Sequence, residues 1–238
     1  MRVAPDLNRQ QLLNCLTKMT ITPESIMQQL SSENLGDRLR AVNQIRQLEK
    51  NIGFQLLQTA IADRDTRVRY AAVSQMASLG HQDRDRSLTL LRDCLLNDPE
   101  ADVQAAAADS IGALKLTEAF EDLHQVYHNT SEWLVQLSII AALGELGDPR
   151  GFELLQDGLI NGNELIQTVA ISALGELGDR QAIPLLISRA SDPDWQIRHR
   201  IAQALSRLGG EEVQEVLQQL ATDEVSQVAQ EAQSTQNS

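Results

Sequence analysis

Apolar residues recur along the chain at intervals of about 31 residues, and each recurrence has the same internal pattern. The equivalent positions form one column: Ala41, Ala72, Ala107, Ile139, Ala170, Ile201 and Ala232. In most copies, further apolar residues stand one, four and seven positions after the column residue. Offsets of 0, 1, 4 and 7 place side chains on one side of an α-helix. The pattern therefore predicts a series of equivalent amphipathic helices.

A second helix is expected in each interval, because signals for a helix end and for a helix start stand close together. The heptapeptide Ala-Leu-Gly-Glu-Leu-Gly-Asp occurs at 142–148 and again at 173–179. Its second glycine stands where one helix must stop, and its aspartate stands where the next helix is capped. Asp–Pro pairs at 98–99 and 192–193 also indicate helix starts. Each unit should therefore contain two helices joined by a tight turn.

Such units cannot bury their apolar faces alone, so the pattern predicts an all-α fold in which they stack into a right-handed, curved α-α superhelix. We expect about six helix pairs and a partial C-terminal pair over residues 35–232. Residues 1–34 do not fit the register. Thr22 and Pro23 predict the start of one helix there, and we expect this segment to form an N-terminal helical cap. Residues 233–238 lose the apolar stripe and are expected to fray.

Composition narrows the class of protein. Hydrophobic residues make up 42% of the chain and aromatic residues only 3%, which fits helices packed through small aliphatic side chains. Two cysteines, Cys15 and Cys94, are too few for a disulfide framework and indicate a reducing compartment. No apolar run approaches the roughly 18 residues of a membrane span, and the N-terminus does not have the pattern of a signal peptide. We therefore expect a cytoplasmic protein without a membrane span.

Charge is unevenly distributed along the chain. Residues 36–92 carry ten Lys/Arg and six Asp/Glu, a net charge of +4, whereas residues 93–238 carry seven Lys/Arg and twenty-four Asp/Glu, a net charge of −17. The total of −13 argues against general nucleic-acid binding. The field of such a chain should orient charged partners.

Arg64, Arg67 and Arg69, reinforced by Arg38 and Arg40, form one basic patch. We expect this patch to dock an acidic surface of a partner protein. Ion pairing on the helix surface is the simpler alternative, and contact with phosphates is another.

The repeat resembles the HEAT-like repeat of the phycobilin lyases of the CpcE/CpcF type, which handle the bilin chromophores of light-harvesting phycobiliproteins. The shared pattern is Val/Ile followed by Arg/Gln, then two small or apolar residues, then Ala-Leu-Gly-x-Leu-Gly-Asp. It occurs here as VRYAAVSQMASLG, VQAAAADSIGALK, VQLSIIAALGELGD, IQTVAISALGELGD and IRHRIAQALSRLGG. The resemblance covers about residues 35–232, and residues 95–155 are similar to the members of this family that act in phycobilisome degradation.

This resemblance implies a HEAT-like repeat solenoid that acts on phycobilisomes during nutrient starvation. It implies phycobiliprotein subunits as partners, phycocyanobilin as the ligand, and no required cofactor. It also implies a cytoplasmic location at thylakoid-bound phycobilisomes. Some relatives work as heterodimers, so pairing with a second chain is a further expectation.

Both tryptophans of the chain occupy one repeat position. Trp133 and Trp195 lie two repeats apart, which is about 20 Å on the same wall at ordinary interhelical spacings. A flat conjugated ligand, or an apolar helix of a partner, could lie across that gap. The alternative is that each tryptophan fills a seam between neighbouring helices.

The segment Asp-Trp-Gln-Ile-Arg-His-Arg brings further polar groups beside Trp195. A bilin offers two propionates, which suit Arg200, and pyrrole nitrogens, which suit an imidazole or a carboxylate. We take His199 as a candidate base that removes a proton from ring A while the phycobiliprotein cysteine leaves as thiolate. Asp109 is the candidate for holding the ring nitrogens, and Tyr70, at the repeat position of His199, is a further bilin contact. The alternative is an exposed His–Arg pair that makes surface hydrogen bonds.

His124 and His128 are one helical turn apart, a spacing that can grip a metal ion, but no motif supplies further ligands, so no metal site is predicted. Two functions therefore compete. The protein either binds a bilin on its concave helical face and detaches or sequesters it, or acts as a non-catalytic adaptor that docks on phycobiliproteins or other proteins. Whether chromophore release is catalytic stays open.

Overall fold

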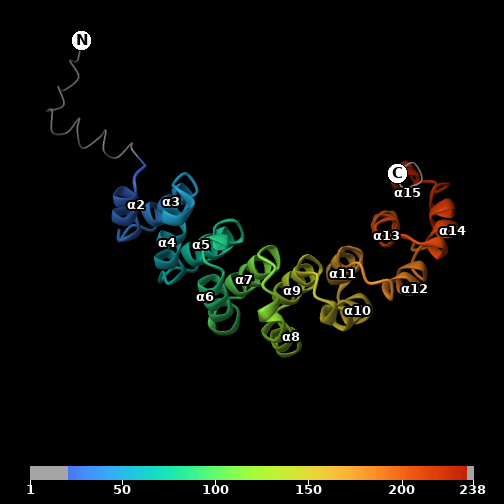
Figure 1. Ribbon diagram of the computed structural model, residues 1–238, viewed down its shortest axis with the longest axis horizontal. Helices are drawn as coiled ribbons and strands as arrows, with labels where there is room; N and C mark the ends of the chain where they lie inside the picture. Colours follow the sequence, from blue (N-terminus) through green and yellow to red (C-terminus); the bar gives the residue numbers. More distant parts are fainter. Residues whose placement is uncertain (1–20, 235–238) are drawn as a thin grey trace, which may run out of the picture. The chain divides into compact units, whose positions relative to one another are not determined.

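The computed structural model describes residues 21–234, and this part of the chain contains fourteen α-helices, three short 3-10 helices and no β-strand (Figure 1). The chain divides into two compact units, residues 1–87 and 88–238. Cys15, most of the expected N-terminal cap and residues 235–238 lie outside the described residues. Of the predicted cap, Thr22 and Pro23 begin a helix as expected, with the Thr22 hydroxyl accepting from the Ser25 amide.

Successive helices form pairs, in which the even-numbered helix comes first and the odd-numbered helix comes second. The first unit holds α2 (Pro23–Leu30), α3 (Leu35–Ile45), α4 (Lys50–Ile61), α5 (Thr66–Leu79) and the start of α6 (Arg84–Asn97). The second unit continues with α7 (Ala101–Ala113), α8 (Phe120–Asn129), α9 (Trp133–Leu146), α10 (Phe152–Asn161), α11 (Glu164–Leu177), α12 (Ala182–Ile187), α13 (Trp195–Leu208), α14 (Glu211–Leu220) and α15 (Ser226–Ser234). The 3-10 helices are Gly80–Gln82, Thr117–Ala119 and Pro149–Gly151.

The second helices of the second unit form one continuous row. In this unit α7 packs on α9, α9 on α11, α11 on α13 and α13 on α15, while α8, α10, α12 and α14 cover the other side (Figure 1). From α11 to α15 the chain curves so that α13 and α15 lie on the inner side. In the first unit α2 packs on α3, α4 on α5 and α3 on α5. The segment expected to close the N-terminal end thus supplies the first helix of the first pair.

The predicted apolar column is the centre of this packing. All seven column residues, from Ala41 to Ala232, are completely buried, one in each second helix. The residues one and four positions later are also completely buried in every copy that the pattern identified. Seven positions later the burial is less complete, since Leu48 and Leu177 are only half-buried. The prediction of a repeated all-α fold is confirmed.

In the second helices from α3 to α13, a long polar side chain ties the helix to the turn before it. The donor is the Arg or Gln after the Val/Ile of the repeat, or Arg38 after Asp37 in α3, and its terminal nitrogen donates to the backbone carbonyl six residues earlier at 2.8–3.3 Å. The donors are Arg38, Arg69, Gln104, Gln136 and Arg198. Gln167 reaches the carbonyl of Gly162 in the same way, at 2.8 Å. This hydrogen bond explains why the repeat carries Arg or Gln at a position close to the core.

Glycines inside the helices allow the row to pack closely. A Cβ added to Gly112, Gly144 or Gly175 would lie 2.7 Å from the Cα of Ala142, Ala173 or Ala204 on the next second helix. These three glycines are therefore contact points between helices. The repeated heptapeptide places one such glycine three residues before the glycine that ends the helix. That second glycine, Gly147 or Gly178, has the left-handed conformation expected of it, with φ of 69° or 75°.

The Asp–Pro pairs lie slightly outside the helices that they were expected to start. Asp148 does cap a helical turn and accepts from the Arg150 amide at 3.0 Å. Asp98 and Asp192, however, accept from amides two residues later in the turn, and α7 and α13 begin after Glu100 and Asp194. Here the prolines shape the turn between the two helices of a pair.

We expect Gly144→Ala to lower the free energy of unfolding by about 1–2 kcal/mol, because the new methyl group would overlap the backbone of α11. The gain in helix propensity, up to about 1 kcal/mol, offsets only part of this cost. Gly151→Ala is the matched control, since its Cβ would meet Leu143 at an ordinary 3.4 Å. Urea denaturation followed by circular dichroism measures both. Equal effects of the two substitutions would contradict the proposed role of Gly144.

Candidate functional site

One side of the second-helix row in residues 88–234 faces solvent and carries most of the predicted site. Every fourth residue of these helices lies on this side, because four residues make slightly more than one helical turn. On α9 these residues are Trp133, Leu137, Ala141 and Glu145, and on α13 they are Trp195, His199, Gln203 and Arg207, all exposed or half-buried. We call this surface the wall.

Both tryptophans project from the wall into solvent. Trp133 is 49% exposed at the first position of α9, and Trp195 is 39% exposed at the first position of α13. Leu165, at the second position of the intervening α11, is 56% exposed. The repeat pattern did not identify Leu165, although an apolar residue outside the apolar register of its helix is a detectable signal.

The polar groups beside Trp195 are contributed by three neighbouring helices. His199 on α13 has its Nε2 atom 3.7 Å from Oε2 of Glu231 on α15. Arg200 is exposed, and its Nη1 atom donates to Ser172 Oγ on α11 at 3.2 Å. The sequence placed a second guanidinium, that of Arg198, in the same cluster, and this was wrong. Arg198 is only 9% exposed, because its position on the helix points it into the turn below.

Asp109 lies apart from His199. It is on α7, and α9 and α11 separate α7 from α13, a distance of about 25–30 Å at ordinary interhelical spacings. Asp109 reaches solvent, but the packed helices remove much of the water near its carboxyl group. This desolvation raises its pKa, and a hydrogen bond with the Ser138 side chain lowers it in part. Burial also raises the pKa of Glu145, with Glu176 and Asp109 adding repulsion. The wall therefore has an acidic part that is distinct from the tryptophan part.

Tyr70 and the arginine patch belong to the first unit. Tyr70 is 49% exposed on α5. Arg64 pairs with Glu33, Arg67 pairs with Asp65 at 3.1 Å, and Arg69 donates to the carbonyl of Asp63 at 3.1 Å. Each arginine proposed for docking thus has an acceptor within the chain, as the ion-pair alternative expected. Arg38, counted as part of the patch from sequence, is buried and does not belong to this surface.

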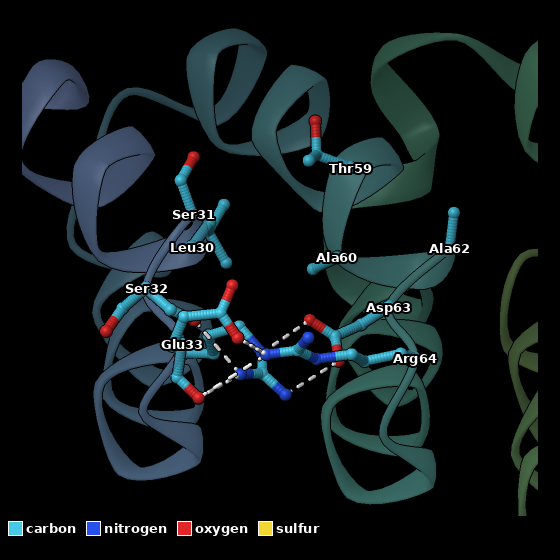
Figure 2. Close-up of a pocket in the computed structure, with 10 residues that line it drawn as sticks. Leu30, Ser31, Ser32, Glu33, Thr59, Ala60, Ala62, Asp63 and Arg64 are labelled. Atoms are coloured by element: carbon cyan, nitrogen blue, oxygen red, sulfur yellow. Dashed lines mark hydrogen bonds and ion pairs between the residues drawn. The ribbon is translucent and has the colours of Figure 1, made fainter.

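Arg38 and Arg198 are the centres of two equivalent buried ion pairs. Arg38 Nε donates to Asp63 at 2.8 Å, and Arg198 Nε donates to Asp223 at 2.7 Å, each pair joining one repeat to the next. A pocket of about 290 Å³ lies over the first pair and one of about 430 Å³ lies over the second. Figure 2 shows the first pocket between the ends of α2 and α4, with Glu33 and Arg64 facing each other near Asp63. Since both arginines use their nitrogens on carbonyls and carboxylates of the chain, we interpret the pairs as clamps between repeats.

The remaining candidates are packed or isolated. The rings of His124 and His128 are 4.6 Å apart, and among the described residues no group of three or more His, Cys, Asp or Glu gathers as a metal site would require. Tyr127 is buried and donates to Asp157 at 2.9 Å, while Cys94 is buried in α6. In residues 21–234 no helix has both the length and the apolar character needed to pass through a bilayer.

The match to a family profile agrees with the repeated fold. The family profile for HEAT repeats matches residues 23–109, 88–170 and 159–235. The complex of CpcE and CpcF of phycocyanin lyase from Nostoc sp. PCC7120 is similar in structure, with a TM-score of 0.61 and 20% identity over 92% of this chain and 94% of that chain. A designed armadillo repeat protein in complex with the peptide (KR)4 has a TM-score of 0.48 and 16% identity, over 92% and 99% of the two chains. The comparison with curated proteins gives no match.

We expect Arg198→Ala to lower the free energy of unfolding at pH 7 by about 3 kcal/mol, because it leaves Asp223 buried without its partner. The Arg198 hydrogen bonds hold the pKa of Asp223 below its ordinary value of 3.8. The stability from this pair is therefore complete above about pH 4 and is lost as pH falls through the lowered pKa. The difference between the variant and the natural chain should shrink in acid. Arg200 is exposed on the same helix, so Arg200→Ala should change the free energy of unfolding by less than about 0.5 kcal/mol. Urea titrations from pH 3 to pH 7 measure the stability of both variants.

A second titration experiment concerns Asp109. Its raised pKa means that the ionised carboxylate disfavours the folded state at neutral pH, and this penalty disappears as pH falls through the raised value. Asp109→Asn should therefore be more stable than the natural chain at pH 7 and equally stable near pH 3. Asp102→Asn, in the first turn of the same helix, should have the opposite sign at pH 7, because it removes a charge that the helix dipole favours. The same sign for both substitutions would show that Asp109 is not desolvated.

Proposed function

The chain belongs to the HEAT-repeat family, and from this premise we propose that it binds phycobiliproteins and handles their bilin chromophore on the wall of the second unit. The observation that carries the proposal is the exposed pair Trp133 and Trp195, which stand on one wall with Arg200 and His199 beside the second tryptophan. The chains of a similar fold are, by their name, those of a phycocyanin lyase. That likeness supports the fold, and the chemistry of the wall supports the ligand.

The tryptophan part of the wall suits a flat, conjugated ligand. An indole ring offers a large apolar face at low conformational cost, and the pair spans about 20 Å with α11 between them. Arg200 is exposed and could exchange its hydrogen bond to Ser172 for a propionate, which forms a stronger, charge-assisted bond. Of the acids of the wall, Glu145 and Glu176 stand near the C-terminal ends of α9 and α11, whereas Glu164 stands at the start of α11.

His199 is the proposed base for releasing the chromophore. In such a step the imidazole takes a proton from the ring A carbon next to the thioether. The C–H electrons form a new double bond, and the C–S electrons leave with the cysteine sulfur as thiolate. Glu231, 3.7 Å from His199 Nε2, would stabilise the imidazolium that forms. Asp109 is too far from His199 to act on the same ring, so we assign it no part in this step.

In this proposal the biological setting is phycobilisome degradation during nutrient starvation, at thylakoid-bound phycobilisomes. Detachment of the bilin, or its sequestration after release, would make the antenna proteins ready for breakdown. Phycocyanobilin is the proposed ligand.

A second candidate is a non-catalytic adaptor that docks on phycobiliproteins or other partner proteins. The observation that favours it is that, in residues 21–234, the one ion-pair contact of His199 is with Glu231, at 3.7 Å. Such an adaptor would use the same exposed tryptophans as contact residues.

Titration of the purified chain with free phycocyanobilin separates the two candidates. Binding on the wall should shift or sharpen the visible absorption band, because stacking on an indole and pairing with a guanidinium change the conformation and environment of the pigment. Trp195→Ala together with His199→Ala should abolish the effect. Met27→Ala removes an exposed apolar side chain of the first unit and should leave the effect intact.

Phycocyanin is the second probe in the same experiment. A chromophore-handling protein should release pigment from the denatured subunit, and His199→Gln should stop release while the complex still forms. An adaptor would co-elute with phycocyanin and leave the spectrum of the free bilin unchanged. A chain that neither alters the bilin spectrum nor co-elutes with phycocyanin would exclude both candidates.

A further inference from the structure

The exposed large apolar side chains of the second unit gather at one edge. Within residues 88–234 they all lie at or beside the turns that join a first helix to a second helix, at a helix end or at one of the first two positions of a helix. They are Leu96, Trp133, Ile160, Leu165 and Trp195, with exposed fractions of 37%, 49%, 58%, 56% and 39%. We call them the apolar row. Elsewhere in this unit, large apolar residues are buried or half-buried. The exposed large apolar side chains of the unit are therefore concentrated in the apolar row.

The central part of the apolar row has a regular spacing. Trp133, Leu165 and Trp195 stand at the starts of α9, α11 and α13, which pack side by side. Neighbouring helices lie about 8–10 Å apart, so the starts of these three helices are about that distance from one another. Residues seven apart on an α-helix are about 10.5 Å apart along its axis. A partner helix that lies across these three helix starts would therefore place one apolar residue against each repeat, and these residues would come from successive heptads of the partner helix.

Carboxylates accompany the apolar row. Glu100, Glu132, Glu164 and Asp194 stand at the starts of α7, α9, α11 and α13, and all four are exposed. Glu100 and Glu132 occupy capping positions without making a capping hydrogen bond, so local helix capping does not account for them. The arginines near this edge are engaged elsewhere, since Arg189 pairs with Asp192 at 3.1 Å and Arg198 is buried against Asp223. The edge is both apolar and negatively charged.

We propose that the apolar row is the docking site for a cationic amphipathic helix of a partner protein. Its apolar face would pack on Trp133, Leu165 and Trp195, and its lysine or arginine side chains would meet the carboxylates at the helix starts. Charge complementarity selects this occupant, because an acidic or uncharged polar helix would leave the carboxylates unpaired or repelled. The inference goes beyond bilin handling, since it names a second ligand class and uses Leu96, Ile160, Leu165 and the edge carboxylates, which take no part in holding a bilin.

Two synthetic peptides of 15 residues test the proposal on the full chain. Both have leucine in a helical heptad pattern, and the remaining positions are lysine in one peptide and glutamate in the other. The two tryptophans of the chain both lie in the apolar row, so their fluorescence reports binding directly. We expect the lysine peptide to shift the emission to shorter wavelength and to bind more weakly as salt increases, and the glutamate peptide to have no effect.

Variants that keep both tryptophans identify the surface. Ile160→Ser with Leu165→Ser should weaken binding of the lysine peptide by about tenfold or more, since each substitution removes an apolar contact with the peptide. Glu132→Gln with Glu164→Gln should weaken it several-fold and reduce its salt dependence. Met27→Ser, which alters an equally exposed apolar residue of the first unit, should have no effect. Circular dichroism checks that each variant remains helical.

The outcomes separate this inference from the proposed function. Equal binding of the two peptides, or full binding by the Ile160→Ser, Leu165→Ser variant, would overturn the docking site. Bilin binding is measured on the same variants by absorption. If bilin binding persists while the lysine peptide fails to bind, only the docking site is wrong, and if the peptide binds while the bilin does not, the docking site stands without the bilin proposal.

Discussion

Close contact between the backbones of successive second helices is the constraint on which the second unit depends. A glycine on each of α7, α9 and α11 faces an alanine of the next helix, at a distance that leaves no room for a side chain. This contact fixes the spacing and rotation of the helices in the row. With the rotation fixed, the apolar column points into the core, and the opposite side of each helix necessarily faces solvent as the wall.

Polar tethers add a second constraint, which concerns the turns. In the second helices from α3 to α13, an Arg or Gln in the first turn donates to a carbonyl of the preceding turn and so links the turn to the helix. At Arg38 and Arg198 the same side chain also reaches an aspartate of the next repeat. These tethers hold the helix starts in place, and the helix starts are where Trp133, Leu165 and Trp195 are exposed.

The two proposals use one scaffold in different ways. Bilin handling needs a flat apolar surface with a guanidinium and an imidazole at one side, and α13 supplies these groups. Ser172 on α11 contacts the guanidinium, and Glu231 on α15 contacts the imidazole. Docking of a cationic helix needs a regular apolar row with carboxylates, which the edge of the unit supplies. Trp133 and Trp195 belong to both surfaces. A bilin and a partner helix should therefore compete for them, which would couple partner binding to chromophore binding.

The amino-acid sequence by itself determined the repeat, the helix pairs and the buried column, because helical periodicity depends on local geometry and Ala41 through Ala232 follow it in every copy. It also indicated that Trp133 and Trp195 share a wall, since equivalent repeat positions share a face. It misplaced Arg198, because one residue of helix rotation, about 100°, separates a buried ion pair from a surface group. It did not separate Asp109 from His199, or distinguish the glycines between helices from those in turns. Only tertiary packing decided these points, because they depend on which helix lies next to which and at what distance.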